Sequence, residues 1–476
     1  MGSKPLLIFF QFFTEALVVN FCALLFSLQL AAPIIKNFYS FIDIPKGYFP
    51  ELGLSLFLFI LILLFAGGFL SVIFSIFSLN LKSLSSLLKK SDSGDYSKEN
   101  VFGKTSVILQ FVVAQAVIIG TLVLIKQIYF INHKDLGYRT ENVVLAQLPG
   151  DLKSLNSLTG ELMSVPGVKG VSYSSVAPAE SQQWSDFSLF KNNEEKHVDA
   201  ELKSIDSSYL KLYSFTLVAG QNFSSGDTSA SVILNREFLT EVGFTNPDEV
   251  IGLKMPGIGR NGAFVKGVVE NFHSGSIHGK IRPCVFINNP GSFRIVNIKL
   301  EVSSSNSKIV LPGEIANIDK NWKKIFPGKE FRYQFLNDMI AGYYMAEHKA
   351  LNLFVLFASI TIFLCILGIL GLSLSMNERR TKEIGLRKVN GATVSEVMIL
   401  LNKNFIKWVA IAFIIAGPVA FYVMNKWLQN FAYKTSLSWW IFALAGMIAL
   451  LIALLTVSLQ SWRAATRNPV EALRYE

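Results

Sequence analysis

Long apolar stretches without charged residues alternate with polar segments along the chain, and this pattern predicts an integral membrane protein. A membrane-spanning helix needs about 20 consecutive, mostly apolar residues. The stretches that meet this requirement are Leu6–Ile35, Leu52–Leu81, Thr105–Ile125, Leu351–Met376, Val397–Asn425 and Thr435–Trp462. We therefore expect six transmembrane α-helices. The fifth should be kinked at Gly417-Pro418, because proline removes one helical hydrogen bond.

Between the third and fourth apolar stretches, the pattern changes to that of an α+β domain. Short segments rich in β-branched and aromatic residues predict strands, and they are Val171–Tyr173, Ser231–Leu234, Phe264–Val269, Cys284–Ile287 and Ile295–Leu300. The predicted helices are Leu152–Ser164, Ser208–Leu212, Arg236–Val242 and Phe335–His348. We expect the last of these to run without a break into the fourth span.

The charged residues give the orientation of the spans. Only 16% of residues are charged, against roughly 25% in an average soluble domain, and the formal net charge is +10. Lysines and arginines gather at 82–104, 379–403 and 463–474, whereas the other short loops hold few. Basic loops stay in the cytoplasm, which explains the positive charge without nucleic-acid binding. Both termini should be cytoplasmic and residues 131–345 extracytoplasmic. The aromatic residues Trp427, Tyr433, Trp439 and Trp440 should form an interfacial belt.

The segment Asn377–Glu396 is the most informative polar motif. Gly391 suits the left-handed position that ends a helix, and Thr393 with Glu396 has the spacing of a capping box that begins the next one. The motif predicts a short basic helix at the cytoplasmic face, followed by a tight turn and then the fifth span. Such a helix can dock a partner, with Ile384 and Leu386 filling the partner's groove. The alternative is a positively charged segment that only fixes the topology.

Other classes of site have weak support in the sequence. The sequence contains no G-x-x-x-x-G-K-[ST] phosphate loop, which argues against ATP binding by this chain. His273 and His278 lack the neighbouring ligands of a metal site. No row of polar residues follows any span, although Gln110 and Gln115 lie within the third. We therefore expect neither a catalytic centre nor a hydrophilic channel.

Several motifs together resemble the MacB/FtsX-type ABC transporter permeases. The cytoplasmic segment EIGLRKVNGAT begins at Glu383, and the tail RAATRNPVEALRYE is similar to that family's closing motif. DLGYRTENVV after the third span, VPGVKGVS, VILNREF and GVVENFHSGSIHGKIRP are similar to its outer domain. The resemblance implies a protein of the bacterial inner membrane, with a large extracytoplasmic α+β domain of the MacB-like periplasmic core type and an FtsX-like permease domain.

The resemblance also implies which residues contact the partner. In such permeases, the cytoplasmic motif is a coupling helix that rests on a separate ATP-binding subunit. Carried over by position, the coupling residues are Glu378, Arg379, Arg380, Thr381, Glu383, Ile384, Gly385, Arg387, Lys388, Gly391 and Ala392. ATP and Mg would then be bound by the partner, and this chain would hold no cofactor or metal and would not itself be an enzyme.

The implied function is mechanotransmission. ATP hydrolysis by the partner would move the outer domain, for export or efflux of a peptide, lipid-linked or drug-like substrate. The alternative is a regulatory or sensory membrane protein that does not transport and signals to a periplasmic partner such as a cell-wall hydrolase or sensor kinase. Further partners would be membrane lipid, a second permease chain or a second copy of this one, and a periplasmic adaptor.

The domain order suggests a permease with an incomplete first unit. We expect a transmembrane hairpin at 1–90, a cytoplasmic linker at 91–104, a transmembrane helix at 105–130, the extracytoplasmic domain at 131–345 and the permease domain at 346–476. The first hairpin resembles the last two spans, as if it ended a first unit. This gives the expectation that most of that unit is missing from the sequence.

Overall fold

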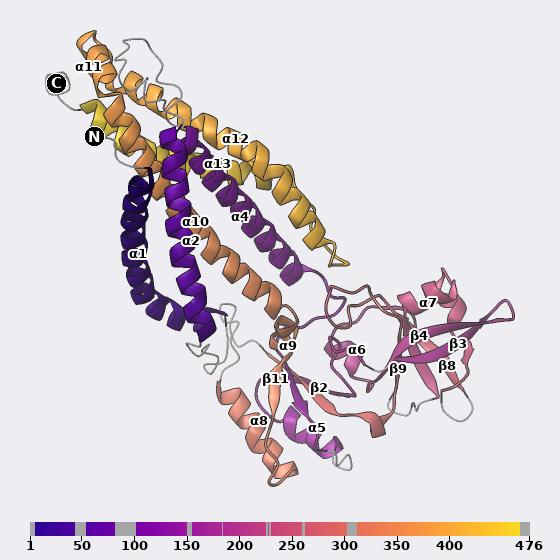
Figure 1. Cartoon of the computed structure of the whole chain (residues 1–476). Coiled ribbons are helices and arrows are strands. Elements are labelled where there is room, and N and C mark those ends of the chain that lie inside the picture. The colour runs from indigo at the N-terminus through magenta and orange to yellow at the C-terminus, as the bar shows by residue number, and fades with distance from the viewer. Residues whose placement is uncertain are drawn as a thin grey trace. The chain divides into compact units, whose positions relative to one another are not determined.

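The computed structural model describes residues 5–42, 54–80, 101–149, 155–182, 184–224, 227, 230–258, 262–301 and 312–466. Contacts divide the chain into two compact units, which Figure 1 shows. The helical unit comprises Met1–Ile125, Lys349–Met424 and Leu437–Glu476. The α+β unit comprises Lys126–His348 and Asn425–Ser436. The second unit therefore includes the connection between the last two long helices as well as the segment between the third and fourth spans.

Long apolar helices supply most of the helical unit. Their bounds are Pro5–Ile42 (α1), Leu54–Asn80 (α2), Val101–His133 (α4), Met345–Arg379 (α10), Val394–Leu428 (α12) and Trp439–Thr466 (α13). Within the described residues, five helices are long and apolar enough to cross a membrane, and α2 carries a shorter apolar stretch, Phe57–Phe69. Multiple membrane crossings are thus supported, while the number six stays a prediction. The helix α12 continues through Gly417 and Pro418, and the expected kink there also stays a prediction.

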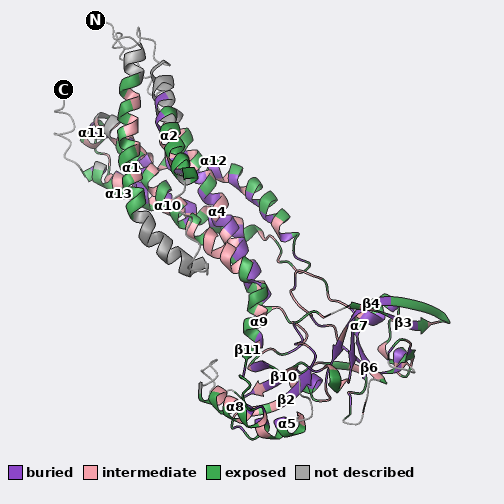
Figure 2. Ribbon diagram, turned by 60° about the horizontal axis from the view of Figure 1, so that its bottom comes forward, coloured by how far each residue is buried: buried purple, intermediate pink, exposed green. Residues whose placement is uncertain are grey.

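Small side chains let the helices of the helical unit approach one another closely. The buried cluster that joins α4, α10, α12 and α13 includes Phe111 and Ile369 together with three alanines of α12 and α13. A Cβ atom built on Gly368 would lie 2.2 Å from Gln110 Oε1, so α10 passes directly over that amide. Small residues permit this approach in membrane helices. Figure 2 shows that, in contrast, the described side chains of α1, at 10–29, are mostly exposed, as expected of a helix that faces lipid.

The first sheet of the α+β unit has four antiparallel strands in the order β11-β1-β10-β2. The strands are Val143–Gln147 (β1), Val168–Ser174 (β2), Ile295–Leu300 (β10) and Tyr333–Phe335 (β11). Two helices, Leu155–Met163 (α5) and Pro312–Ile325 (α8), cover one face and bury Leu158, Leu162 and Trp322 against it. A third helix, Leu336–Tyr343 (α9), follows β11 directly.

The second sheet has seven strands in the order β3-β4-β9-β6-β8-β5, with β7 paired to β8. The strands are Trp184–Lys191 (β3), Glu194–Ser204 (β4), Leu217–Gly220 (β5), Ser231–Asn235 (β6), Lys254–Met255 (β7), Ala263–Val269 (β8) and Cys284–Ile287 (β9). The short helices are Tyr209–Leu212 (α6) and Arg236–Val242 (α7), with one-turn 3-10 helices at Pro247–Val250 and Pro290–Ser292. Figure 2 shows that the buried residues of the α+β unit are concentrated in its sheets.

Predicted and observed elements agree where the sequence signal is strong. The strands at Cys284–Ile287 and Ile295–Leu300 and the helix at Arg236–Val242 have the predicted bounds. The expectation of an unbroken helix from Phe335 into the fourth span is wrong, because the chain turns at Tyr344 between α9 and α10. The Tyr344 side chain is buried there, and its hydroxyl accepts a hydrogen bond from the Ile277 amide at 2.9 Å. That contact ties the turn at Tyr344 to Ile277.

Candidate coupling site

The segment that was predicted to face the cytoplasm forms a short helix, α11 (Thr381–Val389), between α10 and α12 (Figure 1). Its end is a Schellman motif. The Ala392 amide donates to the Arg387 carbonyl at 2.9 Å, and the Gly391 amide donates to the Lys388 carbonyl at 3.1 Å. Gly391 has a φ of 90°, a left-handed conformation that costs an L-residue roughly 1–2 kcal/mol. The predicted helix end at this glycine is confirmed.

The next helix begins at a capping box. The Glu396 carboxylate accepts a hydrogen bond from the Thr393 amide at 2.9 Å, and Thr393 Oγ1 accepts one from the Glu396 amide at 3.4 Å. Both contacts satisfy amide groups that have no partner within the helix. The turn between α11 and α12 is therefore fixed on both sides, and the two helices keep a defined relative orientation.

One face of α11 packs against this chain. Ile384 is 5% exposed and lies in a cluster with Val397 and Leu401 of α12 and Ala465 of α13. Gly385 is buried beside it. We had expected Ile384 to fill a partner's groove, but its burial assigns it to support of the helix from within the chain.

The opposite face of α11 is free of packing among the described residues. Leu386 is 58% exposed and Val389 is 64% exposed. Arg387 donates a hydrogen bond to Glu383 at 2.9 Å, one helical turn away, and an exposed pair of this kind contributes only about 0.3–0.5 kcal/mol. Apolar side chains and charges on one exposed face are the composition of a protein contact.

A hollow of about 480 Å³ lies where α11 meets α12. Its lining residues are Arg387, Asn390, Gly391, Ala392, Glu396 and Val397. Sequence reasoning had selected Arg387, Gly391 and Ala392 but not Val389, Asn390 or Glu396 as contact residues. The position of Val389 one turn after Leu386 could have identified it, because residues three apart share a helical face.

The remaining predicted residues surround the start of α11. Glu378 and Arg379 end α10, and Arg380 occupies the N-cap position of α11. The Thr381 hydroxyl donates to the Asn377 carbonyl at 2.9 Å. The structure thus brings the predicted residues together at the end of α10, in α11 and in the turn before α12.

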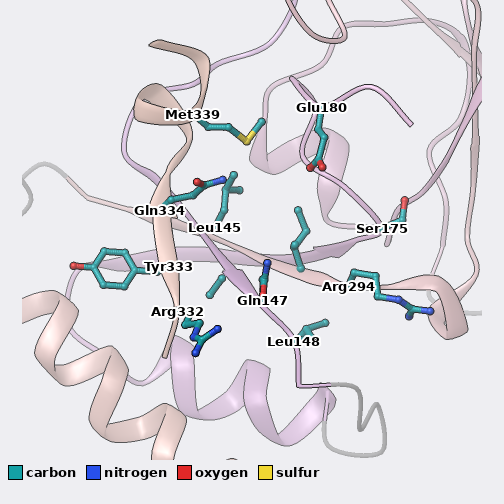
Figure 3. A pocket seen from close by; sticks show the side chains of 12 residues that line it. Leu145, Gln147, Leu148, Ser175, Glu180, Arg294, Arg332, Tyr333, Gln334 and Met339 are labelled. Carbon is teal, nitrogen blue, oxygen red and sulfur yellow. The ribbon is translucent and has the colours of Figure 1, made fainter. Parts of the chain in front are cut away.

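A second hollow, of about 590 Å³, lies in the α+β unit. Its lining residues include Leu145, Gln147, Ile295, Glu180 and Met339. Figure 3 shows the Glu180 carboxylate directed into the hollow, whereas the Arg294 side chain extends away from it. Arg294 instead donates hydrogen bonds to the carbonyls of Gly291 and Phe293.

The two histidines of the motif GVVENFHSGSIHGKIRP, His273 and His278, contact aromatic rings. Among the described residues, no group of three or more potential ligands lies close enough to hold a metal ion. His273 lies edge-on to the Tyr433 ring at 4.7 Å, and His278 stacks on Phe431 at 4.4 Å. Both histidines therefore contact the connection between α12 and α13, a pairing that the sequence alone did not predict.

Comparison with known proteins agrees with this architecture. The model of the FtsX-like permease C-terminal family matches residues 355–469, which include α11 and all of α12. The uncharacterized ABC transporter permease YknZ of Bacillus subtilis is 22% identical over 356 residues, which are 72% of this chain and 86% of that protein.

Two solved structures cover part of the chain. The periplasmic region of MacB from Actinobacillus actinomycetemcomitans is 14% identical and covers 43% of this chain and 92% of that one, with a TM-score of 0.29. The extracellular domain of the noncanonic ABC-type transporter YknZ from Gram-positive bacteria is 16% identical and covers 40% of this chain and 97% of that one, with a TM-score of 0.27. The family match over residues 355–469 and the similarity to YknZ over most of the chain support a MacB/FtsX-type ABC transporter permease.

Proposed function

We propose that this permease couples ATP hydrolysis by a separate ATP-binding subunit to movement of its α+β domain on the outer side of the inner membrane. The movement would drive export of a peptide, lipid-linked or drug-like substrate. Glu383, Leu386, Arg387 and Val389 would contact the ATP-binding subunit. ATP and Mg would be held by that subunit.

The observation that carries the proposal is the construction of α11. The helix is capped at its end by Gly391, held to α12 and α13 through Ile384, and exposes Leu386 and Val389. A segment that only fixed the topology would require positive charge but neither a fixed turn nor exposed apolar side chains. A rigid element with an apolar exposed face is suited to carry force from a bound partner into α12.

The contact can be tested with the double variant Leu386→Asp/Val389→Asp. Burying two carboxylates in an interface is unfavourable, so we expect at least a tenfold loss of co-purification with the ATP-binding subunit. Both side chains are more than half exposed, so the fold should be retained. Phe264→Asp, at a 52% exposed position of β8 in the α+β unit, is the matched control and should bind normally.

Two results would contradict the proposal. One is full binding and full ATP-dependent activity in the double variant. The other is appreciable ATP hydrolysis by the purified chain alone. Substrate efflux from vesicles that contain the complex would then separate transport from signalling, because a sensor would show coupled ATP hydrolysis without substrate movement.

A further inference from the structure

The connection between α12 and α13 is part of the α+β unit. Residues Asn425–Ser436 belong to that unit by their contacts. The end of α4 from Lys126 and the start of α10 up to His348 belong to it as well. We refer to Asn425–Ser436 as the 425–436 loop. Three chain segments that adjoin predicted spans therefore meet within one compact body.

The end of α4 holds the 425–436 loop through its main chain. Gln127 is fully buried. Its Nε2 donates to the Tyr433 carbonyl at 3.3 Å, and its Oε1 accepts from the Thr435 amide at 2.9 Å. The Lys126 ammonium donates to the Ser436 carbonyl at 2.8 Å. Because a buried amide needs hydrogen-bond partners, these contacts fix the position of the loop.

The loop that carries His273 and His278 also contacts the 425–436 loop. The Ala432 amide donates to the His278 carbonyl at 2.9 Å. The His278 ring stacks on Phe431, with ring centres 4.4 Å apart and an angle of 24° between the planes. Phe431 is buried in a cluster with Ile131, Ile277 and Tyr344. Stacked rings of this kind contribute energy beyond their buried area.

His278 also contacts the first turn of α10. Its Nε2 lies 2.9 Å from Glu347 Oε1, and the Glu347 side chain is only 12% exposed. The other carboxylate oxygen of Glu347 is buried without a hydrogen-bond partner among the described residues. Because a buried carboxylate without a partner is unfavourable, the contact with His278 is important for keeping Glu347 in this position. The second imidazole nitrogen of His278 is hydrogen-bonded to Ser276, which orients the ring.

One side chain thus joins three elements. We propose that His278 is a positioning residue that locks the 425–436 loop and the first turn of α10 to the α+β domain, so that movement of α10 and α12 reaches the domain through this contact. The nucleotide-driven part of this inference rests on the proposed function. The lock itself, formed by the contacts of His278 with Phe431 and Glu347, is a property of the chain alone and is tested first.

Hydrogen exchange of the full-length chain in detergent tests the lock. The reporter is the Ala432 amide, whose acceptor is the main-chain carbonyl of His278 and therefore survives substitution of the side chain. We expect His278→Ala to speed exchange at Ala432 at least tenfold, with exchange in β9 and β10 unchanged. The control is His197→Ala, because His197 makes a similar contact with Asp186 at 2.9 Å on the exposed β3–β4 hairpin. It should leave Ala432 unchanged. Equal exchange at Ala432 in wild type and His278→Ala overturns the proposal, as does an equal effect of the control.

The positioning role is tested in the complex with the ATP-binding subunit. Trapping with MgATP and vanadate should change exchange at residues 273–282 in the wild type. In His278→Ala, this change should fall at least threefold while ATP hydrolysis continues. An undiminished change in His278→Ala overturns the positioning role. Failure of the subunit to bind the wild-type chain contradicts the proposed function instead, and the result at Ala432 still decides whether the lock exists.

Discussion

Replacing Lys203 with methionine should destabilise the α+β domain strongly. Lys203 lies on β4 with no exposed side-chain surface, and Glu201 Oε2 lies 3.6 Å from its ammonium. The ammonium donates to the carbonyls of Pro178 and Glu180 at 2.9 and 2.8 Å and to the Ser274 hydroxyl at 2.6 Å. Burial lowers the pKa of Lys203, and the nearby Glu201 carboxylate opposes that shift. The side chain therefore binds two loops, 175–182 and 272–282, to the sheet.

The magnitude follows from what methionine leaves behind. Its stem fills nearly the same space, so no large cavity forms. The carbonyls of Pro178 and Glu180 lose their donor, and breaking a buried ion pair by removing one partner costs about 3–5 kcal/mol. Glu201 keeps its hydrogen bonds from Ser181 at 2.7 Å and Ser274 at 2.5 Å, which limits the cost. We expect a loss of about 4 kcal/mol in the free energy of unfolding.

Cys284 provides the assay. The thiol is buried, and burial raises its pKa to about 12, so it should react with a maleimide only when the domain opens. With Cys22 and Cys365 replaced by alanine, a loss of about 4 kcal/mol should speed labelling roughly 1000-fold when opening is at equilibrium. The control is Lys196→Met, whose pair with Glu194 is exposed. Labelling of Lys203→Met within threefold of this control would refute the reasoning.

Three further predictions concern pH, packing and topology. Burial lowers the pKa of His273 to about 4 from 6.5, so the unfolded chain binds more protons between these values and stability should fall as pH drops from about 6.5 to 4. His273 should account for a loss of about 3 kcal/mol in the free energy of unfolding. Thermal unfolding across this pH range should show this loss in the wild type but not in His273→Gln. Gly368→Ala should cost about 1–2 kcal/mol by overpacking against Gln110, and adding Gln110→Ala should restore thermal stability. An impermeant thiol reagent applied to intact cells should label a cysteine introduced at Asn193 but not one introduced at Asn377, and the reverse pattern would invert the topology.

The helices of the membrane part could be predicted because the length and apolar composition of each are visible in its own segment of the sequence. The bounds of α12, for instance, lie within three residues of the predicted fifth span. The β3–β4 hairpin was missed, because Glu194–His197 is an exposed, charged strand end without apolar alternation. The positive φ angles of Asn192 and Asn193, 50° and 65°, show the tight turn that joins the strands. Two adjacent asparagines were the available signal for that turn.

In the candidate site, too, features set by neighbouring residues were predicted, and features set by distant residues were not. The helix end at Gly391 and the capping box of Thr393 and Glu396 depend on neighbouring residues, and the sequence predicted both. The inward position of Ile384 depends on Ala465 of α13, which is distant along the chain. Likewise, Trp427 and Tyr433 were predicted to belong to an interfacial belt, and the sequence did not show that both pack against the buried cluster around Phe431. Tertiary contacts of this kind leave no local pattern.

The two ends of α12 are fixed by the same kind of contact. At its start, the amides of Gly391 and Ala392 bind carbonyls of α11, and Thr393 and Glu396 cap each other's amides. Beyond its end, Gln127 binds the main chain of the 425–436 loop on both sides of Lys434. Hydrogen bonds to the main chain fix geometry with little dependence on which side chains the turn carries. Under the proposed function, a helix anchored in this way at both ends would transmit a displacement with little loss in its connections. Any compliance would then reside within α12 itself, where Pro418 lacks the amide hydrogen that would bond the Ile414 carbonyl.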